Sequence, residues 1–413
     1  MKAPAALALV LLTGCTANKA YQLKSPPVVD GKLDLSFCSL EFDDQGELWR
    51  GAGTDEDPLA RVRAHIREKG TGKGAVVFFF VHGWNHSAAD SDENVQALKE
   101  LLARRAQDEC EKANGSPDLQ PIIGVFIGWR GRSTTFLPLF SFWSRGAAAA
   151  RVGSIAMTDV LLELLGDVRE TSDASQSVVI GHSFGGVIVE RALAQAFLGM
   201  SVGRRSTSHR RATSADLRPP ADLVVLVNPA SSALSAKQFI EALTRSEIRV
   251  RNPLQPLLIS VTSVADLATK DAFPLGQAPV SWTKKFRPSY ADLPPGAPSQ
   301  LHLFRHTAGH VPFLHSHEVR EVSRVEGPAP EGSIRFKIWD KGLRREYSLE
   351  PRTGAWNKTG YWITSVPKEV IPNHSDIFRE SFESLLTAIL ERAQIYRSTA
   401  RKGPTQVIEE RAQ

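Results

Sequence analysis

Apolar runs and amphipathic stretches alternate along most of the chain. Short apolar runs bounded by turn residues lie at residues 75–81, 121–128, 177–180, 222–227, 256–261 and 361–366. Runs of this kind are typical of strands that are buried on both faces of a sheet. Stretches with helical periodicity lie at residues 60–68, 92–110, 147–165, 187–198, 236–243 and 377–394. The alternation predicts right-handed β-α-β crossovers and an α/β fold with a mostly parallel, doubly wound sheet.

Two segments show the shorter period of exposed strands. Residues 35–49 alternate between apolar and polar side chains and contain a turn signal, Asp-Gln-Gly, which predicts a hairpin. A second hairpin is predicted from residues 334–339 pairing with residues 345–349.

Composition places the chain among ordinary globular proteins. It has 413 residues, of which 42% are hydrophobic and 23% charged, which excludes disordered, collagen-like and disulfide-dense classes. We expect one elaborated α/β domain over residues 36–400, with insertions at about 203–220 and 270–354 and a C-terminal tail at 401–413. The net charge of +5 is modest for this length, so no nucleic-acid partner is expected.

The first residues have the character of a targeting segment. Lys2 precedes a short apolar stretch at residues 3–12, and the sequence LTGC follows at residues 12–15. This resembles the lipobox of bacterial lipoproteins. The resemblance implies a signal peptide at 1–14, a lipidated Cys15, and a tether at 15–35 that links the domain to a membrane. Thr16 in place of Asp implies the outer membrane, facing the periplasm or the cell surface. The alternative is a buried N-terminal helix or a signal peptide cut elsewhere.

The cysteine content raises the question of whether Cys38 and Cys110 form a disulfide. If Cys15 is acylated, Cys38 and Cys110 are the only remaining thiols. In an exported chain such a pair suggests one disulfide. The alternative is two separate cysteines that pack as small apolar side chains.

A motif for a nucleophile follows the apolar run at 177–180. The sequence GHSFGG at residues 181–186 has the form G-x-S-x-G, preceded by a predicted strand and followed by a predicted helix. That context places Ser183 on a sharp, strained turn where its Oγ is exposed at the end of the strand. Glycine is needed on both sides of the serine because side chains there would collide with the helix or the strand.

These residues resemble the nucleophile elbow of the α/β-hydrolase superfamily, close to its lipases and esterases. The match covers roughly residues 75–395. The resemblance implies an oxyanion hole made of two backbone N–H groups. By position these belong to Trp84, in the loop after the strand at 75–81, and to Phe184, with Asn85 as the alternative to Trp84. His82 in the same loop is interpreted mainly as a structural residue.

The superfamily order, serine then acid then histidine, points to two further residues. Asp266 lies shortly beyond the strand at 256–261, with Asp271 in reserve and a helix cap as its alternative role. His374 precedes the last helix, where the superfamily keeps its histidine, and Asp376 is expected to cap that helix or to bond near it.

A cluster of histidines supplies the rival candidates for the base. Its members are His302, His306, His310, His315 and His317. The spacing of the first three would place them on one helix face, a possible zinc site, but Gly309 and Pro312 argue against a continuous helix. We expect a pocket-wall or fold role for this cluster, with no metal and no cofactor.

The sequence therefore predicts a serine esterase or lipase-like enzyme with the triad Ser183, Asp266 and His374, acting on an ester or lipid-like small molecule. Residues 136–143 are almost all apolar and form either core packing or an acyl-binding wall or lid. Arg130 is a candidate for holding an anionic group, or for a surface ion pair. The alternatives for the whole chain are an acyltransferase or thioesterase that uses the same triad, and a non-catalytic envelope lipoprotein.

Overall fold

The computed structural model describes residues 19–50, 57–112, 119–132, 138–207, 220–245, 256–287, 294, 296–322 and 330–392. The chain divides into two compact units, residues 1–199 and 200–413. The predicted signal peptide, Cys15 and the tail at 401–413 lie outside the described residues.

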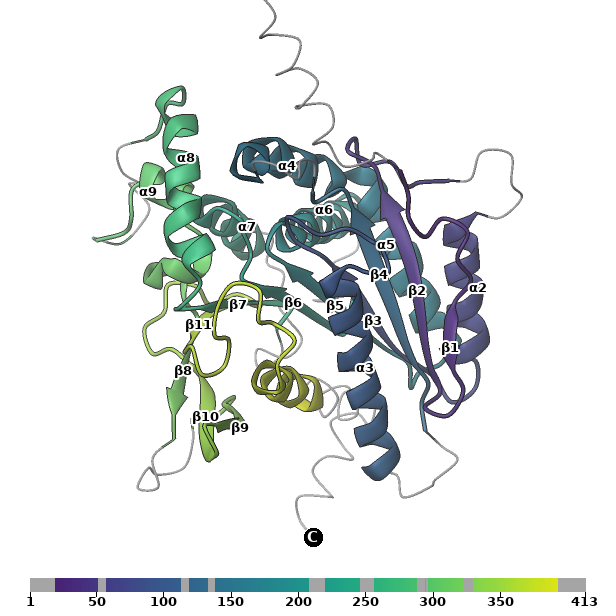
Figure 1. The fold of residues 1–413 in the computed structure, drawn as a ribbon. Helices are drawn as coiled ribbons and strands as arrows, with labels where there is room; N and C mark the ends of the chain where they lie inside the picture. The colour runs from purple at the N-terminus through teal and green to yellow at the C-terminus, as the bar shows by residue number, and fades with distance from the viewer. Residues whose placement is uncertain are drawn as a thin grey trace, which may run out of the picture. The chain divides into compact units, whose positions relative to one another are not determined.

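The first unit is built on mostly parallel strands in the order β1-β2-β4-β3-β5 (Figure 1). The parallel members are β2 (Leu35–Phe42), β3 (Val76–Val81), β4 (Ile122–Trp129) and β5 (Gln176–His182). Strands β3 and β4 are almost wholly buried, which explains their continuous apolar sequences. Strand β1 (Val28–Asp30) pairs antiparallel with β2. The segment predicted as a tether thus includes a strand.

Helices cover both faces of these strands. They are α2 (Pro58–Gly70), α3 (Glu93–Lys112), α4 (Pro138–Val152), α5 (Ile155–Thr171) and α6 (Phe184–Thr207). The crossovers from β3 to β4 and from β4 to β5 run in opposite directions across the sheet. Right-handed connections therefore put α3 and α5 on opposite faces, and Figure 1 shows α3 in front of the strands.

The single helix predicted at residues 147–165 is two helices, α4 and α5. The break falls at Gly153, where a Cβ atom would lie 2.9 Å from the carbonyl oxygen of Ile188 in α6. Close contact with α6 interrupts an otherwise continuous helical pattern, because tertiary packing overrides local periodicity.

The hairpin predicted at residues 35–49 is wrong in its second strand. The turn is present, since the Asp43 side chain accepts hydrogen bonds from the N–H groups of Gln45 and Glu47. Beyond it, however, the pairing is limited to one antiparallel bridge, Phe42 to Leu48, with backbone hydrogen bonds from Asp43 N–H to Glu47 and from Trp49 N–H to Glu41. Strand β2 instead pairs with β4 along its whole length, so its alternating pattern belongs to a strand inside a sheet.

The second unit contains three parallel strands in the order β6-β7-β11. These are β6 (Leu223–Val227), β7 (Leu258–Ser263) and β11 (Tyr361–Val366). A separate antiparallel sheet has the order β8-β10-β9, from β8 (His317–Glu321), β9 (Ile334–Asp340) and β10 (Leu343–Pro351). The predicted hairpin between β9 and β10 is confirmed, and its turn residues Lys341 and Gly342 both have positive φ.

The helical elements of the second unit are mostly short. They are α7 (Ala233–Arg245), a π-helical turn η1 (Ala268–Ala272), α8 (Phe273–Trp282), α9 (Gln300–Arg305), the 3₁₀ turns η2 (Ala308–His310) and η3 (Pro312–Leu314), and helical residues 380–392. The break between α9 and η2 agrees with the expectation that Gly309 and Pro312 prevent one continuous helix.

Neither Cys38 nor Cys110 forms a disulfide; both are free cysteines. Cys38 is buried in β2, and burial raises the pKa of its thiol to about 12. Of the two alternatives, the structure therefore has separate cysteines.

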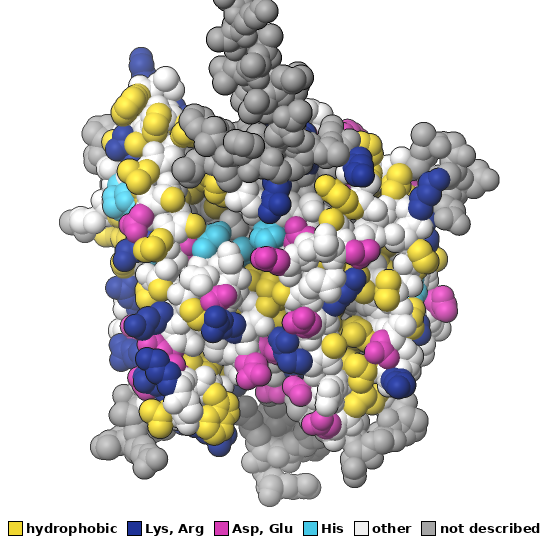
Figure 2. All heavy atoms as spheres, in the orientation of Figure 1, with side chains coloured by type: hydrophobic (Ala, Val, Ile, Leu, Met, Phe, Trp, Pro, Cys, Tyr) yellow, Lys and Arg dark blue, Asp and Glu magenta, His cyan; other side chains and the backbone are white. Residues whose placement is uncertain are grey.

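The fold class predicted from the sequence is confirmed: the chain is an α/β protein with mostly parallel strands. Basic and acidic side chains are interspersed over the face shown in Figure 2, as the modest net charge suggests. Among the described residues, no helix combines the length and the apolar character needed to cross a bilayer.

Two glycines of the first unit, one before α5 and one within it, test the packing argument. Gly153→Ala forces a Cβ against the backbone of Ile188, and we expect it to lower the free energy of unfolding by about 1–3 kcal/mol. Gly166→Ala in α5 is the matched control, because a Cβ there meets nothing within 4 Å. It should stabilise the protein by about 0.5–1 kcal/mol through helix propensity. Chemical denaturation measures both; equal effects would contradict the account.

Candidate active site

The predicted nucleophile lies on a sharp turn in the first unit. Strand β5 ends at His182, helix α6 begins at Phe184, and Ser183 between them has a φ of 55°. A side chain other than glycine pays about 1–3 kcal/mol for this left-handed conformation. Strain of this kind persists only where contacts with the surrounding structure stabilise it, so the packing around Ser183 must keep this turn in its left-handed conformation.

Glycines surround Ser183 because the backbone leaves no room for Cβ atoms. At Gly185 a Cβ would lie 2.0 Å from the carbonyl oxygen of Val81, and at Gly181 it would lie 2.7 Å from the carbonyl oxygen of Gly185. At Gly83 it would lie 2.7 Å from the Cβ of Ser183 itself. The loop after β3 therefore lies directly against the serine, as an oxyanion loop must.

His82 is a structural residue of that loop. Its ring is fully buried and stacks between Phe126 and Trp129, with centroid distances of 5.4 and 5.7 Å. Its Nε2 accepts the backbone N–H of Trp129 at 3.0 Å, so the proton lies on Nδ1, which is 2.9 Å from the carbonyl oxygen of Gly83. Burial lowers the pKa of His82 to about 4. A neutral imidazole with both nitrogens occupied fixes the loop and does not act as a base.

The backbone N–H of Asn85 is already used. Asn85 has a φ of 67°, and its N–H donates to the carbonyl oxygen of Gly131 at 3.1 Å. The Asn85 N–H is therefore bonded within the unit, and Trp84 stays the predicted first oxyanion donor. The second candidate, Phe184, is the first residue of α6, where helix N–H groups favour negative charge.

Aromatic side chains flank both oxyanion candidates. The ring of Phe142 lies 5.8 Å from that of Trp84 and 5.3 Å from that of Phe184. Trp143, next along α4, is 46% exposed. These are the members of the apolar segment 136–143 whose side chains the structure describes, and they form a wall beside the serine turn.

A cavity of about 450 Å³ lies at the carboxyl ends of β2 and β4. Its lining includes Glu41, His86, Trp129 and Arg130. The guanidinium of Arg130 lies 3.4 Å from the carboxylate of Asp44, so the ion-pair interpretation of this residue holds.

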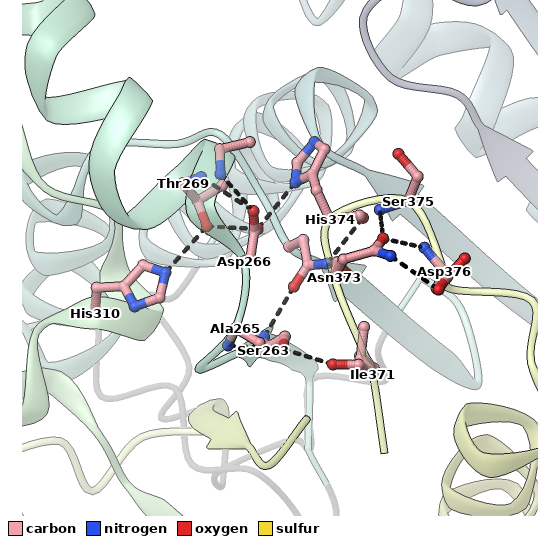
Figure 3. Close-up of polar contacts among 12 residues, drawn as sticks. Ser263, Ala265, Asp266, Thr269, His310, Ile371, Asn373, His374, Ser375 and Asp376 are labelled. Carbon is pink, nitrogen blue, oxygen red and sulfur yellow. Dashed lines mark hydrogen bonds and ion pairs between the residues drawn. The ribbon is translucent and has the colours of Figure 1, made fainter. Parts of the chain in front are cut away.

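In the second unit, Asp266 and His374 form a hydrogen-bonded pair (Figure 3). Asp266 follows β7 and is fully buried, whereas the His374 side chain is 25% exposed. The distance from His374 Nδ1 to Asp266 Oδ2 is 2.9 Å. Because an ionised carboxylate only accepts, the proton of this hydrogen bond lies on Nδ1 and the lone pair of the neutral ring lies on Nε2.

The Asp266 carboxylate remains ionised despite its burial. Burial alone would raise its pKa, but hydrogen bonding to His374, the imidazolium charge and the bonds from Thr269 together lower the pKa below the usual value. The backbone N–H groups of Ala268 and Thr269 donate to Oδ1 at 2.9 and 3.1 Å, and the Thr269 hydroxyl donates to Oδ2 at 2.5 Å. Asp271, the reserve candidate, lies in η1.

Asn228, which the sequence did not predict as a site residue, joins the end of β6 to the end of β7 and to the His374 loop. It is fully buried with a φ of 46° at the end of β6. Its Oδ1 accepts the N–H of Ser263, and its Nδ2 donates to the carbonyl oxygens of Asn373 and His374 at 3.2 and 3.0 Å. The positive φ has no sequence signal beyond the Asn-Pro dipeptide, which marks a turn.

The loop that carries His374 is folded on itself. The Oδ1 atom of Asn373 accepts the N–H groups of Ser375 and Asp376. The Asp376 carboxylate accepts from Asn373 Nδ2 and pairs with Arg379 at 2.9 Å. Asp376 therefore orders the loop ahead of the last helix.

The histidine cluster divides into packed and exposed members. His315 Nε2 lies 3.0 Å from the carbonyl oxygen of Gly309, and His317 stacks on Trp362 at 3.9 Å. His302 and His306 stack on each other at 4.0 Å. Within the part of the chain that the structure describes, no group of three or more His, Cys, Asp and Glu side chains is arranged to hold a metal ion.

Each unit thus brings part of the predicted site together. Ser183, Trp84 and Phe184 lie in the first unit, and Asp266 and His374 lie in the second. By its fold the chain is an α/β protein, and its mostly parallel sheet is compatible with the α/β-hydrolase fold. A scan against protein-family models and a search of curated proteins find no match to this chain.

Buried neutral histidines predict a loss of stability in acid. Burial lowers the pKa of His82, His315 and His317 to about 4 from a usual value of 6.5. As the pH falls from 6.5 toward 4, the unfolded chain binds protons that the folded chain does not, so the free energy of unfolding falls. His317→Phe keeps the ring on Trp362 and should reduce this pH slope by about 1.4 kcal/mol per pH unit. Denaturation between pH 6 and pH 5 measures the slope; an unchanged slope would refute the assignment.

Proposed function

We propose that the protein is a serine hydrolase that cleaves carboxylic esters, with Ser183 as nucleophile, His374 as base and Asp266 as acid. The observation that carries the proposal is the Asp266–His374 pair, because a buried carboxylate there orients a partly exposed imidazole and fixes its tautomer, with the proton on Nδ1 and the lone pair on Nε2. The strained turn at Ser183, with an oxyanion-type loop against it, supports the proposal independently.

In the proposed first step, His374 Nε2 takes the proton of Ser183 Oγ as that oxygen attacks the ester carbonyl carbon. The ring becomes an imidazolium, and the ionised Asp266 stabilises it and keeps Nδ1 protonated throughout. Backbone N–H groups of Trp84 and Phe184 stabilise the negative oxygen of the tetrahedral intermediate, at about 2.7–4 kcal/mol for each donor.

The intermediate then collapses. His374 returns its proton to the leaving alcohol, and the acyl group stays on Ser183 as an ester. Water, deprotonated by His374, attacks that ester and releases the carboxylic acid, which regenerates the serine. Acyl transfer to an alcohol or amine would use the same residues, with the acceptor in place of water.

The substrate class follows from the surface beside Ser183. The rings of Trp84, Phe142 and Phe184 offer an apolar wall, which suits the acyl chain of a lipid-like ester. In this proposal the segment 136–143 contributes to substrate binding through Phe142.

The proposal extends to location at a membrane. The LTGC motif supports a lipid anchor on Cys15. The backbone N–H groups of Tyr21 and Gln22 donate to the Glu41 carboxylate at 2.8 and 2.6 Å, at the carboxyl end of β2. Six residues of extended chain span at most about 20 Å, so an anchor on Cys15 would keep that end of the sheet near the lipid surface.

Hydrolysis of p-nitrophenyl esters of increasing chain length tests the function. Ser183→Ala and His374→Ala should each lower kcat by about 10⁴-fold or more, and Asp266→Asn by about 10⁴-fold. His306→Ala is the matched control: its Nδ1 bonds to the carbonyl of His302 in the short helix before it. We expect it to keep wild-type activity. Wild-type rates in folded Ser183→Ala would defeat the proposal, whereas ester products formed with added alcohol would identify acyl transfer.

A further inference from the structure

One histidine of the cluster, His310, is linked to the buried carboxylate of the proposed triad through the hydroxyl of Thr269. It ends the 3₁₀ turn η2, which packs against β7. A Cβ at Gly309 would lie 2.1 Å from Thr262 Oγ1, so only glycine permits this approach. The carbonyl of Gly309 is also bonded to His315 at 3.0 Å. The turn is therefore fixed at the end of β7, where Asp266 lies.

A chain of hydrogen bonds joins His310 to His374 (Figure 3). His310 Nε2 lies 3.0 Å from Thr269 Oγ1, Thr269 Oγ1 lies 2.5 Å from Asp266 Oδ2, and that oxygen lies 2.9 Å from His374 Nδ1. The directions follow from chemistry. The carboxylate only accepts, so Thr269 donates its single proton to Asp266, and His310 must then donate Nε2–H to Thr269.

We propose that Thr269 and His310 are positioning residues that set the orientation and basicity of Asp266, and through it the basicity of His374. This inference rests on the proposed function. Neither residue would touch the substrate, and both would act through the carboxylate.

The effect arises because two donors share one oxygen. The Thr269 hydroxyl and the His374 imidazole both donate to Oδ2, so the hydroxyl withdraws negative charge from the atom that faces the imidazole. Donation from His310 polarises the hydroxyl and strengthens this withdrawal. Without the hydroxyl, Oδ2 is a stronger base and holds the imidazolium more tightly. His374 then returns its proton to the leaving group more slowly.

Other charged and titratable groups near His310 belong to the elements packed around it. Asp266, Lys270 and Asp271 lie at and after the end of β7, and His306 and His315 lie on either side of η2. Burial lowers the pKa of His310. A neutral ring with its proton on Nε2 satisfies the hydrogen-bond directions given above.

The test compares three variants at the buried hydroxyl. Thr269→Val removes the hydroxyl at nearly constant volume and should lower kcat roughly tenfold while leaving KM within about twofold. The acidic limb of the kcat/KM profile should move to higher pH. Thr269→Ser keeps a hydroxyl and should restore both quantities. His310→Phe should reproduce a part of the Thr269→Val effect, and the double variant should equal Thr269→Val alone.

A readout that does not depend on turnover separates this inference from the proposed function. The proton NMR signal of His374 Nδ1–H, assigned by its loss in His374→Ala, should shift in Thr269→Val but not in His306→Gln. An unchanged signal and pH profile in folded Thr269→Val and His310→Phe would overturn the inference and leave the proposed function intact. Full activity in Ser183→Ala would overturn the function itself.

Discussion

A buried negative charge is the constraint on which the second unit depends. Asp266 has no exposed surface, and an uncompensated carboxylate there would cost several kcal/mol. Four donors compensate it: the N–H groups of Ala268 and Thr269, the Thr269 hydroxyl and the ring of His374. The turn after β7, the π-helical segment and the His374 loop must therefore take fixed positions around one carboxylate, which pre-organises an imidazole without any ligand.

The first unit meets a different constraint, which is steric. Ser183 is held at a φ of 55° because the chain must turn from β5 into α6, while the loop after β3 lies against the serine. His82 fixes that loop because both of its ring nitrogens are hydrogen-bonded to the backbone, one to Gly83 and the other to Trp129. Strain in one unit and buried charge in the other are the two costs that the proposed triad would require.

The sequence predicted the strands and most helices because buried parallel strands are continuously apolar and their order along the chain limits the topology. It also predicted the serine turn, since glycines and a strand end mark such a position, whereas the choice of Asp266 and His374 came from the resemblance to the α/β-hydrolase superfamily. It failed at residues 147–165, where contact of Gly153 with α6 breaks a regular pattern, and at residues 35–49, where an alternating strand lies inside a sheet. The contacts of Asn228 and His310 were not predictable, because they join residues 35 to 146 positions apart along the chain.

The most direct test of the central claim is the rate at which an aryl phosphonate ester labels the protein, followed from pH 5 to pH 9. The account predicts a single adduct, mapped to Ser183 by peptide mass spectrometry, whose rate of formation rises with the titration of one imidazole. In His374→Ala the rate should fall by about 10³-fold or more. Labelling of Ser183 at an equal rate in that variant, or an adduct at another residue, would contradict the account.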